Sequence, residues 1–112
     1  MKIPCVVLPS ADRDLDLQAD YLADEASLEI ALRFLTAAHK TFSLLAAHPN
    51  MGWRPSLGPA FHSVRAFPVA DFKNILVLYR TREGVLEIVR VLHGARDLGA
   101  LFAKEPLEEG AP

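Results

Sequence analysis

The residues best suited to chemistry lie near the C-terminal end, in the run RVLHGARD from Arg90 to Asp97. An apolar, β-branched stretch, residues 85–89, precedes it, so the run is predicted to form the end of a strand and the turn that follows. Charged and imidazole groups are costly to bury unless they are paired. These groups therefore either hold a strand-to-helix corner together or face a ligand or partner.

His93 is the residue in this run with the most direct chemical use. An imidazole beside arginines could act as acid or base in RNA cleavage, where the 2′-hydroxyl loses a proton and the leaving oxygen gains one. Such a site needs a second proton-transfer group. We expect Tyr79 to be the only tyrosine, and Lys104 the only lysine, that could supply it. The structural alternative, in which His93 hydrogen-bonds the backbone around Gly94, is favoured.

A wider set of arginines surrounds the predicted sheet, in the loop before it, within its strands and just after the last strand. These elements can converge on one end of an open sheet face, where guanidinium groups would grip phosphates or carboxylates bidentately. The structural alternative is that Arg96 and Asp97 fix the corner by ion pairs and carbonyl contacts, and both interpretations stay open. The set comprises Arg54, Arg65, Arg80, Arg82, Arg90 and Arg96.

No metal or cofactor is predicted. Asp12 to Asp16 opens like a calcium loop, but Leu17 and Ala23 stand where glycine and glutamate are required. The histidines have no metal-type spacing, and the chain contains no phosphate-binding glycine loop or GxSxG elbow. Aspartates recur at every fourth position and predict a solvated ridge on the outer face of the first helix, namely Asp12, Asp16, Asp20 and Asp24.

Composition predicts one cytoplasmic domain. The chain has 112 residues and a formal net charge of −2, enough for a single core. Its lone cysteine, Cys5, is expected to be a buried, inert thiol. No segment suits a membrane span or a secretory signal. Residues 1–104 are expected to form the domain, followed by an acidic, flexible tail at 105–112. Residues 51–104 are basic, which indicates a polyanionic or acidic partner.

The order of predicted elements is β-αα-βββ with a short final helix. A helical hairpin laid on a small antiparallel sheet is the natural α+β arrangement for this order. The connection Arg82-Glu83-Gly84 suits a bulged hairpin between the last two strands. The elements are a strand at 3–8, helices from Ser10 to Ala23 and from Ser27 to Ala47, strands Phe61–Val69, Lys73–Thr81 and Val85–His93, and a helical segment Ala95–Lys104.

The last two predicted strands carry apolar residues on both sides, as inner strands do when both faces of a sheet are covered. Two helices cover one face only. The other face is therefore expected to be open, half apolar and interrupted by arginine, which is typical of an interface that a helical or extended partner segment completes.

Several motifs together resemble the RelE/ParE superfamily of type II toxins, most closely the ParE branch of plasmid stabilisation proteins. They are the loop HPNMGWRP with its PxxG-x-R pattern (Pro49, Gly52, Arg54), the strand ILVLYRT, and EIVRVLHGARDL. The resemblance extends from Val6 to about Phe102. It implies a RelE-like fold and a cytosolic toxin that is neutralised by a cognate antitoxin encoded beside it.

The two branches imply different targets. ParE-like toxins imply DNA gyrase, trapped on broken DNA by protein–protein contact, whereas RelE-like toxins imply cleavage of messenger RNA in the ribosomal A site. RelE-like enzymes carry loop lysines and a late tyrosine, where this chain has Arg54 and Phe102, so we expect a gyrase inhibitor. The alternative is a ribosome-dependent endoribonuclease, and a second is an inactive homologue that serves in antitoxin binding and operon regulation. The ribonuclease candidates are His93, Arg90, Arg96, Arg65 and Arg54.

The resemblance also implies how the antitoxin binds. Family antitoxins fold an acidic, partly disordered C-terminal segment onto the toxin, which suits a basic, half-apolar face. We therefore expect a hetero-oligomer, and a toxin that is poorly soluble alone. The candidates for binding target or antitoxin are Arg54, Arg65, Arg80, Arg90, His93 and Arg96.

Overall fold

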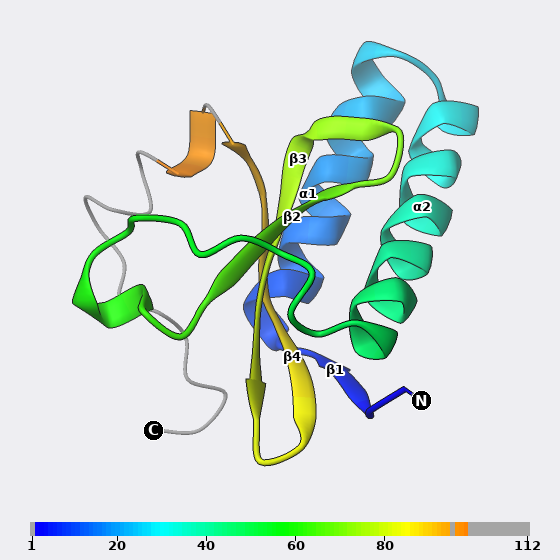
Figure 1. Cartoon of the computed structure of the whole chain (residues 1–112). Helices are drawn as coiled ribbons and strands as arrows, with labels where there is room; N and C mark the ends of the chain where they lie inside the picture. Colours follow the sequence, from blue (N-terminus) through cyan, green and yellow to red (C-terminus); the bar gives the residue numbers. More distant parts are fainter. Residues whose placement is uncertain (1, 95, 99–112) are drawn as a thin grey trace.

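The computed structural model, which describes residues 2–94 and 96–98, has a helical hairpin packed on one face of a four-stranded sheet (Figure 1). This confirms the predicted α+β class and element order. The elements are β1 (Cys5–Val7), α1 (Pro9–Glu25), α2 (Leu28–Ala47), a 3-10 turn η1 (Pro59–Phe61), β2 (Arg65–Val69), β3 (Phe72–Arg82) and β4 (Val85–His93).

The strands lie in the order β1-β4-β3-β2, and β1 pairs with β4 in parallel while the other pairs are antiparallel. The sheet is therefore mixed, and the prediction of an antiparallel sheet holds for β2, β3 and β4 but not for β1. In the register of β3, Ile75 lies opposite His93 and Tyr79 lies opposite Arg65. Four residues of strand span roughly 13 Å, so His93 and Arg65 are held at separate positions along the sheet.

The two helices begin in different ways. Ser27, at the predicted start of the second helix, is the N-cap of α2, since its Oγ accepts a hydrogen bond of 3.1 Å from the Ile30 amide. Ser10, at the predicted start of the first helix, is not the N-cap of α1, because the helix begins at Pro9 and Leu8 is its N-cap. Proline suits the first helical turn, where its missing N–H is not needed and its φ is already helical.

The strand ends also differ from prediction. The strand expected from Phe61 begins at Arg65, because Phe61 closes the turn η1 instead. The β3–β4 connection is a two-residue turn, Glu83-Gly84, with φ of 53° and 78°, as in a type I′ hairpin. The bulge expected at this turn lies instead farther along the pair, where Leu78 lies opposite Arg90 and Tyr79 opposite Ile88, so that Val89 of β4 is the extra residue.

Two apolar clusters cover the two faces of the sheet. The larger lies beneath α1 and α2. The second contains Leu78, Val89 and Leu92 of the sheet, covered by the segment Leu57–Val64, with the partly buried Leu98 packed against it. The prediction of an open, half-apolar sheet face is therefore wrong, since the chain's own loop covers it. Among the residues that the structure describes, the exposed large apolar side chains are those of Val6, Leu17, Tyr21, Leu28, Leu32, Leu44, Met51 and Trp53.

Cys5 is exposed on β1, so the expectation of a buried thiol is wrong. β1 is the edge strand of the sheet and has only three residues, which leaves its outer side uncovered. Protein on the inner side still removes part of the water around the sulfur, and this desolvation raises the pKa of the Cys5 thiol.

The described chain ends in a helical turn after β4, at Gly94 and residues 96–98. The rest of the predicted segment Ala95–Lys104, and the predicted acidic tail at 105–112, lie outside the described residues. Among the residues that are described, no helix is both long and apolar enough to cross a membrane.

Candidate functional site

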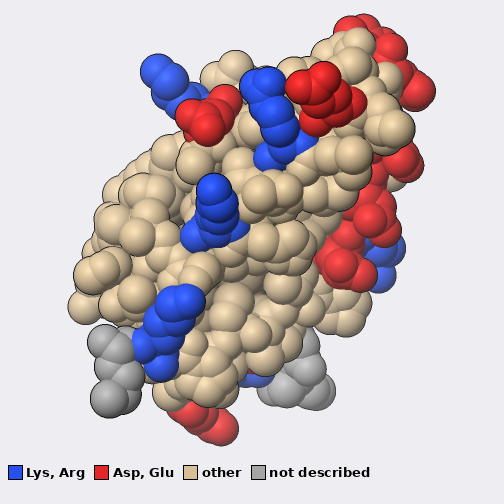
Figure 2. Space-filling view, turned by 90° about the vertical axis from the view of Figure 1, so that its right-hand side faces the viewer, with Lys and Arg blue, Asp and Glu red and all other residues tan. Residues whose placement is uncertain are grey.

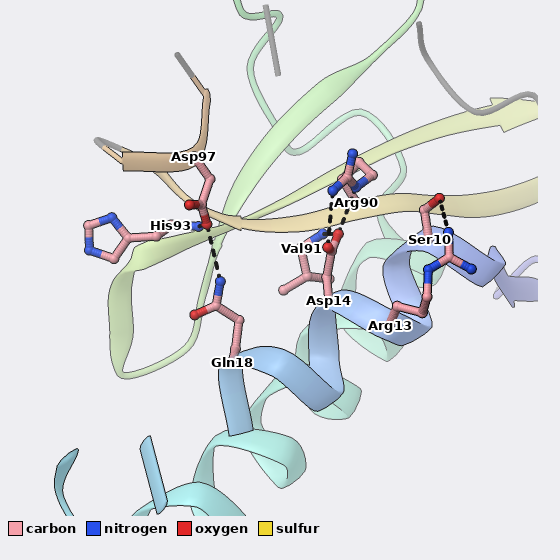
Figure 3. Close-up of polar contacts among 8 residues, drawn as sticks. All are labelled: Ser10, Arg13, Asp14, Gln18, Arg90, Val91, His93 and Asp97. Carbon is pink, nitrogen blue, oxygen red and sulfur yellow. Dashed lines mark hydrogen bonds and ion pairs between the residues drawn. The ribbon is translucent and has the colours of Figure 1, made fainter. Parts of the chain in front are cut away.

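The RVLHGARD run lies where β4 extends beyond its short neighbour β1, which pairs only with residues 86–88. Past that point the Val91 amide donates to Asp14 Oδ2 at 2.9 Å, and the His93 amide donates to Asp97 Oδ2 at 2.8 Å (Figure 3). Carboxylates thus take the place of the carbonyls that a longer β1 would supply. The run is therefore an open edge of β4 whose backbone amides are hydrogen-bonded by the carboxylates of Asp14 and Asp97.

Asp14 is the residue of this corner that the sequence analysis missed. Its side chain is 8% exposed and accepts from Arg90 Nε at 2.8 Å and from Nη2 at 3.1 Å, a bidentate pair. The available signal was its helical spacing: Asp14 is buried beside Ala11, Leu15 and Gln18, whereas the predicted ridge of Asp12, Asp16, Asp20 and Asp24 is exposed as expected.

Asp97 joins the corner to α1 and to its own helical turn. Gln18 Nε2 donates to Asp97 Oδ2 at 3.3 Å, and Arg96 Nε donates to Oδ1 at 3.1 Å. Burial alone would raise the pKa of Asp97, but the His93 amide, the Arg96 guanidinium and Gln18 together hold that pKa below its ordinary value. The carboxylate is thereby kept ionised.

His93 has a structural contact and also faces a cavity. The Arg96 amide lies 3.4 Å from His93 Nδ1 and donates to it, in line with the structural role expected from sequence. His93 also lines a cavity of about 580 Å³ together with Tyr21 of α1 and Lys73 of β3. The expectation that only Tyr79 and Lys104 were available as proton-transfer partners is therefore wrong.

The PxxG loop is held by a phenol in the sheet. Tyr79 Oη accepts from the Gly52 amide at 2.8 Å and donates to the Pro49 carbonyl at 2.8 Å. A Cβ on Gly52 would lie 2.7 Å from both Tyr79 Oη and the Ala66 carbonyl, so only glycine fits. Burial raises the pKa of Tyr79, against the opposing effects of the Gly52 amide and the charge of Arg65, so the phenol keeps its proton.

Two arginines beside this loop are held by backbone carbonyls. Arg65 Nη1 donates to the Gly52 carbonyl at 2.7 Å and more weakly to that of Asn50 at 3.4 Å. Arg54 Nη1 donates to the His62 carbonyl at 2.8 Å. Because a carbonyl carries no net charge, these contacts orient the guanidinium groups without neutralising them.

The structure divides the predicted arginine set rather than gathering it at one end of the sheet. Arg54, Arg65 and Arg80 line one cavity, while Arg90 and Arg96 lie at the β4 edge. Arg80 Nε also contacts Glu87 Oε1 at 2.7 Å, and Arg82 shares this carboxylate at 3.4 Å. The expected convergence is wrong because Arg65 of β2 and Arg90 of β4 lie on opposite sides of β3, and Asp14 of α1 binds Arg90.

No metal centre stands out in the part of the chain that the structure describes, which contains no group of three or more His, Cys, Asp or Glu side chains placed to hold an ion. The chemistry available to the described site is that of guanidinium, imidazole, phenol and carboxylate groups. Such groups can bind anions, pair with a protein partner or move protons.

Known proteins share this architecture. A family model described as the ParE toxin of the type II toxin–antitoxin system parDE matches residues 6–98. The chain belongs to the ParE toxin family. A solved structure described as the chromosomal ParDE TA system from P. aeruginosa is similar, with a TM-score of 0.70 and 22% identity, covering 82% of this chain and 96% of that chain. No curated protein matches. The family match confirms the resemblance to the RelE/ParE superfamily and makes the protein a ParE-type toxin.

Proposed function

We propose that this ParE-type toxin inhibits DNA gyrase in the cytoplasm by protein–protein contact, and that a cognate antitoxin encoded beside it neutralises it. Gyrase is the target that the resemblance to the ParE branch implies. The observation that favours a binding mechanism over catalysis is that the side chains of the RVLHGARD corner contact other groups of the protein itself. Arg90 is bound to Asp14, Arg96 is bound to Asp97, and His93 accepts from a backbone amide.

These contacts make catalysis at the corner less favourable for an electrostatic reason. Cleavage of RNA requires cations that stabilise the charge developing on the phosphate. Arg90 lies in a bidentate pair with Asp14, so its charge is already balanced by a carboxylate. A corner of this kind suits a rigid scaffold that presents a binding surface.

The direct test incubates the purified toxin with gyrase, ATP and supercoiled plasmid, followed by detergent denaturation and electrophoresis. Linear DNA is expected, because a toxin that traps gyrase on cut DNA leaves a double-strand break when the enzyme is denatured. Added antitoxin should abolish the linear product. Intact plasmid at toxin concentrations that arrest growth would refute the gyrase assignment.

The antitoxin surface we propose is a groove of about 620 Å³ between α2 and the β2–β3 turn, with Phe72 in its lining. Leu28 and Leu32 on its wall are 66% and 55% exposed. Its charged lining residues are the basic Arg33 and Lys40 and the acidic Glu29 and Asp71. An acidic amphipathic segment would place apolar side chains on the leucines and carboxylates beside the cations. Figure 2 looks onto this side of the molecule and shows basic side chains crossing a largely uncharged face, with most acidic ones along the right-hand edge and others beside the basic ones at the top and at the bottom.

Two equally exposed leucines test this surface. Leu28 and Leu17 are both 66% exposed, but only Leu28 lines the groove. Leu28→Glu should weaken antitoxin binding by about tenfold or more, because it sets a charge in an apolar contact, whereas Leu17→Glu should leave it unchanged. Calorimetric titration of each toxin with antitoxin gives the comparison. Equal losses, or none, would place the antitoxin elsewhere.

A ribosome-dependent endoribonuclease is the second candidate, and the cavity shared by His93, Tyr21 and Lys73 favours it. These side chains could divide the transfer of protons between them. In this case His93→Ala and Tyr21→Phe should each abolish cleavage of translated messenger RNA while antitoxin binding stays intact. Cleavage by both variants at the normal rate would exclude this mechanism.

A further inference from the structure

A second cavity, of about 350 Å³, opens where the PxxG loop meets the start of β2 and the C-terminal end of β3. It is distinct from the cavity beside His93 and from the groove along α2. Neither the gyrase proposal nor the antitoxin proposal uses it. Its lining consists of Asn50, Arg54, His62, Ser63, Arg65, Tyr79, Arg80 and Thr81.

The cavity is electropositive. Three of its lining residues are arginines, and none of the described residues that line it is acidic. Arg54 and Arg65 are anchored by carbonyls and so keep their full charge. Arg80 is balanced in part by Glu87, which also contacts Arg82. The arrangement is pre-organised for an anion, because its guanidinium groups are already oriented before any ligand arrives.

Neutral donors complete the lining. Ser63 and Thr81 bring hydroxyl groups, and Asn50 brings an amide. His62 Nδ1 lies 2.9 Å from the Pro59 carbonyl. Since a carbonyl oxygen only accepts, Nδ1 carries the proton in this contact, and Nε2 of the neutral ring is therefore an acceptor that adds no donor to the cavity. The site thus combines several donor types within one small volume.

We propose that this cavity binds a phosphate group. A phosphate presents three or more oxygens in a tetrahedral arrangement and matches several guanidinium and hydroxyl donors at once, whereas a carboxylate has two oxygens and would leave donors unmatched. The phosphate belongs to a free nucleotide or to a nucleic-acid backbone, and both present the same chemistry to the cavity. This inference does not depend on gyrase being the target.

The fluorescence of a tryptophan near this cavity can report the binding of a ligand. Trp53, its one tryptophan, precedes Arg54 and pairs with Ala66 of β2. Phosphate bound against Arg54 and Arg65 should change the emission of this indole. We would titrate the full-length toxin with inorganic phosphate, with adenosine monophosphate and with a short DNA duplex, and follow each titration also by calorimetry. Saturable binding of the first two is expected.

Matched variants assign the binding to the cavity. Arg54→Gln removes an exposed guanidinium from it and should weaken phosphate binding by roughly tenfold, as expected for loss of a hydrogen bond to a charged group. Arg33→Gln removes the same charge from α2 and should have no effect. Ser63→Ala changes no charge and should weaken binding by a smaller factor, which separates the cavity's donors from its overall field. Thermal unfolding of each variant verifies that it is folded.

Each outcome decides the proposal. Tighter binding of the duplex than of the nucleotide, lost in Arg54→Gln and kept in Arg33→Gln, supports the cavity with nucleic acid as its source of phosphate. The reverse order of affinities supports a free nucleotide. Equal losses in the two arginine variants would reduce the effect to net charge and overturn the proposal. Absence of saturable binding of inorganic phosphate and of adenosine monophosphate would overturn it as well.

Discussion

Two arginine-containing regions of this molecule, the β4 edge and the PxxG loop, use the same side chain in opposite ways. At the β4 edge Arg90 and Arg96 are bound by carboxylates. At the loop Arg54 and Arg65 are bound by carbonyls. In the first region each guanidinium charge is paired with a carboxylate of the protein. In the second, neutral carbonyls orient the guanidinium groups, and their charge remains available to a ligand.

The difference shows that an arginine's role depends on its acceptor. A carboxylate partner makes the contact sensitive to ionisation, and its removal leaves a poorly solvated cation. A carbonyl partner has no pKa in the accessible range and leaves the guanidinium charge available to a ligand. A run rich in arginine and histidine therefore does not by itself mark a working surface.

The largest expected effect is at Asp14. Asp14→Ala should lower the free energy of unfolding by about 3 kcal/mol or more, since it removes the carboxylate of a buried pair and the acceptor of the Val91 amide. Urea unfolding measures this. Arg90→Met alone and in combination completes a double-mutant cycle, in which the double variant should lose less than the sum of the two. Additive losses would mean that the pair does not act as a unit.

An intermediate effect is expected at the loop, where geometry rather than charge is decisive. Gly52→Ala should cost about 2 kcal/mol, because its Cβ would overlap backbone and a buried phenol. Gly94→Ala is the control, since its nearest neighbour is a flexible leucine carbon at 3.2 Å. Thermal unfolding compares the two. If they are equally stable, the Tyr79 contact is not what fixes the loop.

The smallest effect is a pH dependence specific to the β4 edge. The folded pKa of Asp97 lies below its ordinary value of 3.8, so its contribution is complete above that pH and is lost as the pH falls through the folded pKa. Asp97→Asn keeps an acceptor for the His93 amide but removes the charge. It should therefore flatten the loss of stability below about pH 4.

The control for this pH profile is Asp16→Asn, which removes an exposed carboxylate of α1. Urea unfolding between about pH 5 and pH 3 should show the wild-type slope for Asp16→Asn and a shallower slope for Asp97→Asn. Arg65→Gln, at the carbonyl-held region, should lower stability by the same amount across this range. Identical slopes for the two aspartate variants would contradict the role assigned to Asp97.

Local patterns predicted most of the fold. The period of apolar residues located both helices and the inner strands, and Ser27 marked a helix start because capping is a property of a few adjacent residues. The segment Phe61–Val64 misled because apolar residues there are buried by a turn over the sheet rather than by a strand. Local apolarity does not distinguish these two ways of being buried.

The site was less predictable because its contacts join distant parts of the chain. The His93 corner and the PxxG loop were located from their residue types. Asp14, however, binds an amide 77 residues away, and Tyr21 reaches the cavity of His93 only through the packing of α1 on the sheet. The spacing of residues within one helix or strand does not reveal such pairs. For Arg90 and Arg65 the acceptor that decides the arginine's role lies in another part of the chain, so it could not be predicted either.

The parallel pairing of β1 with β4 has a consequence for synthesis. Residues 5–7 are made well before their partner, residues 86–88, because a long stretch of chain separates the two strands. Asp14 and Gln18 of α1 likewise find their polar partners only in β4 and in Asp97 after it. The helical hairpin can form early from local contacts, but the sheet cannot close until β4 has emerged, because non-local pairing must await its partner. A ribosome stalled before β4 would therefore hold an incompletely folded toxin. The moment at which β4 is synthesised would set when the folded protein appears.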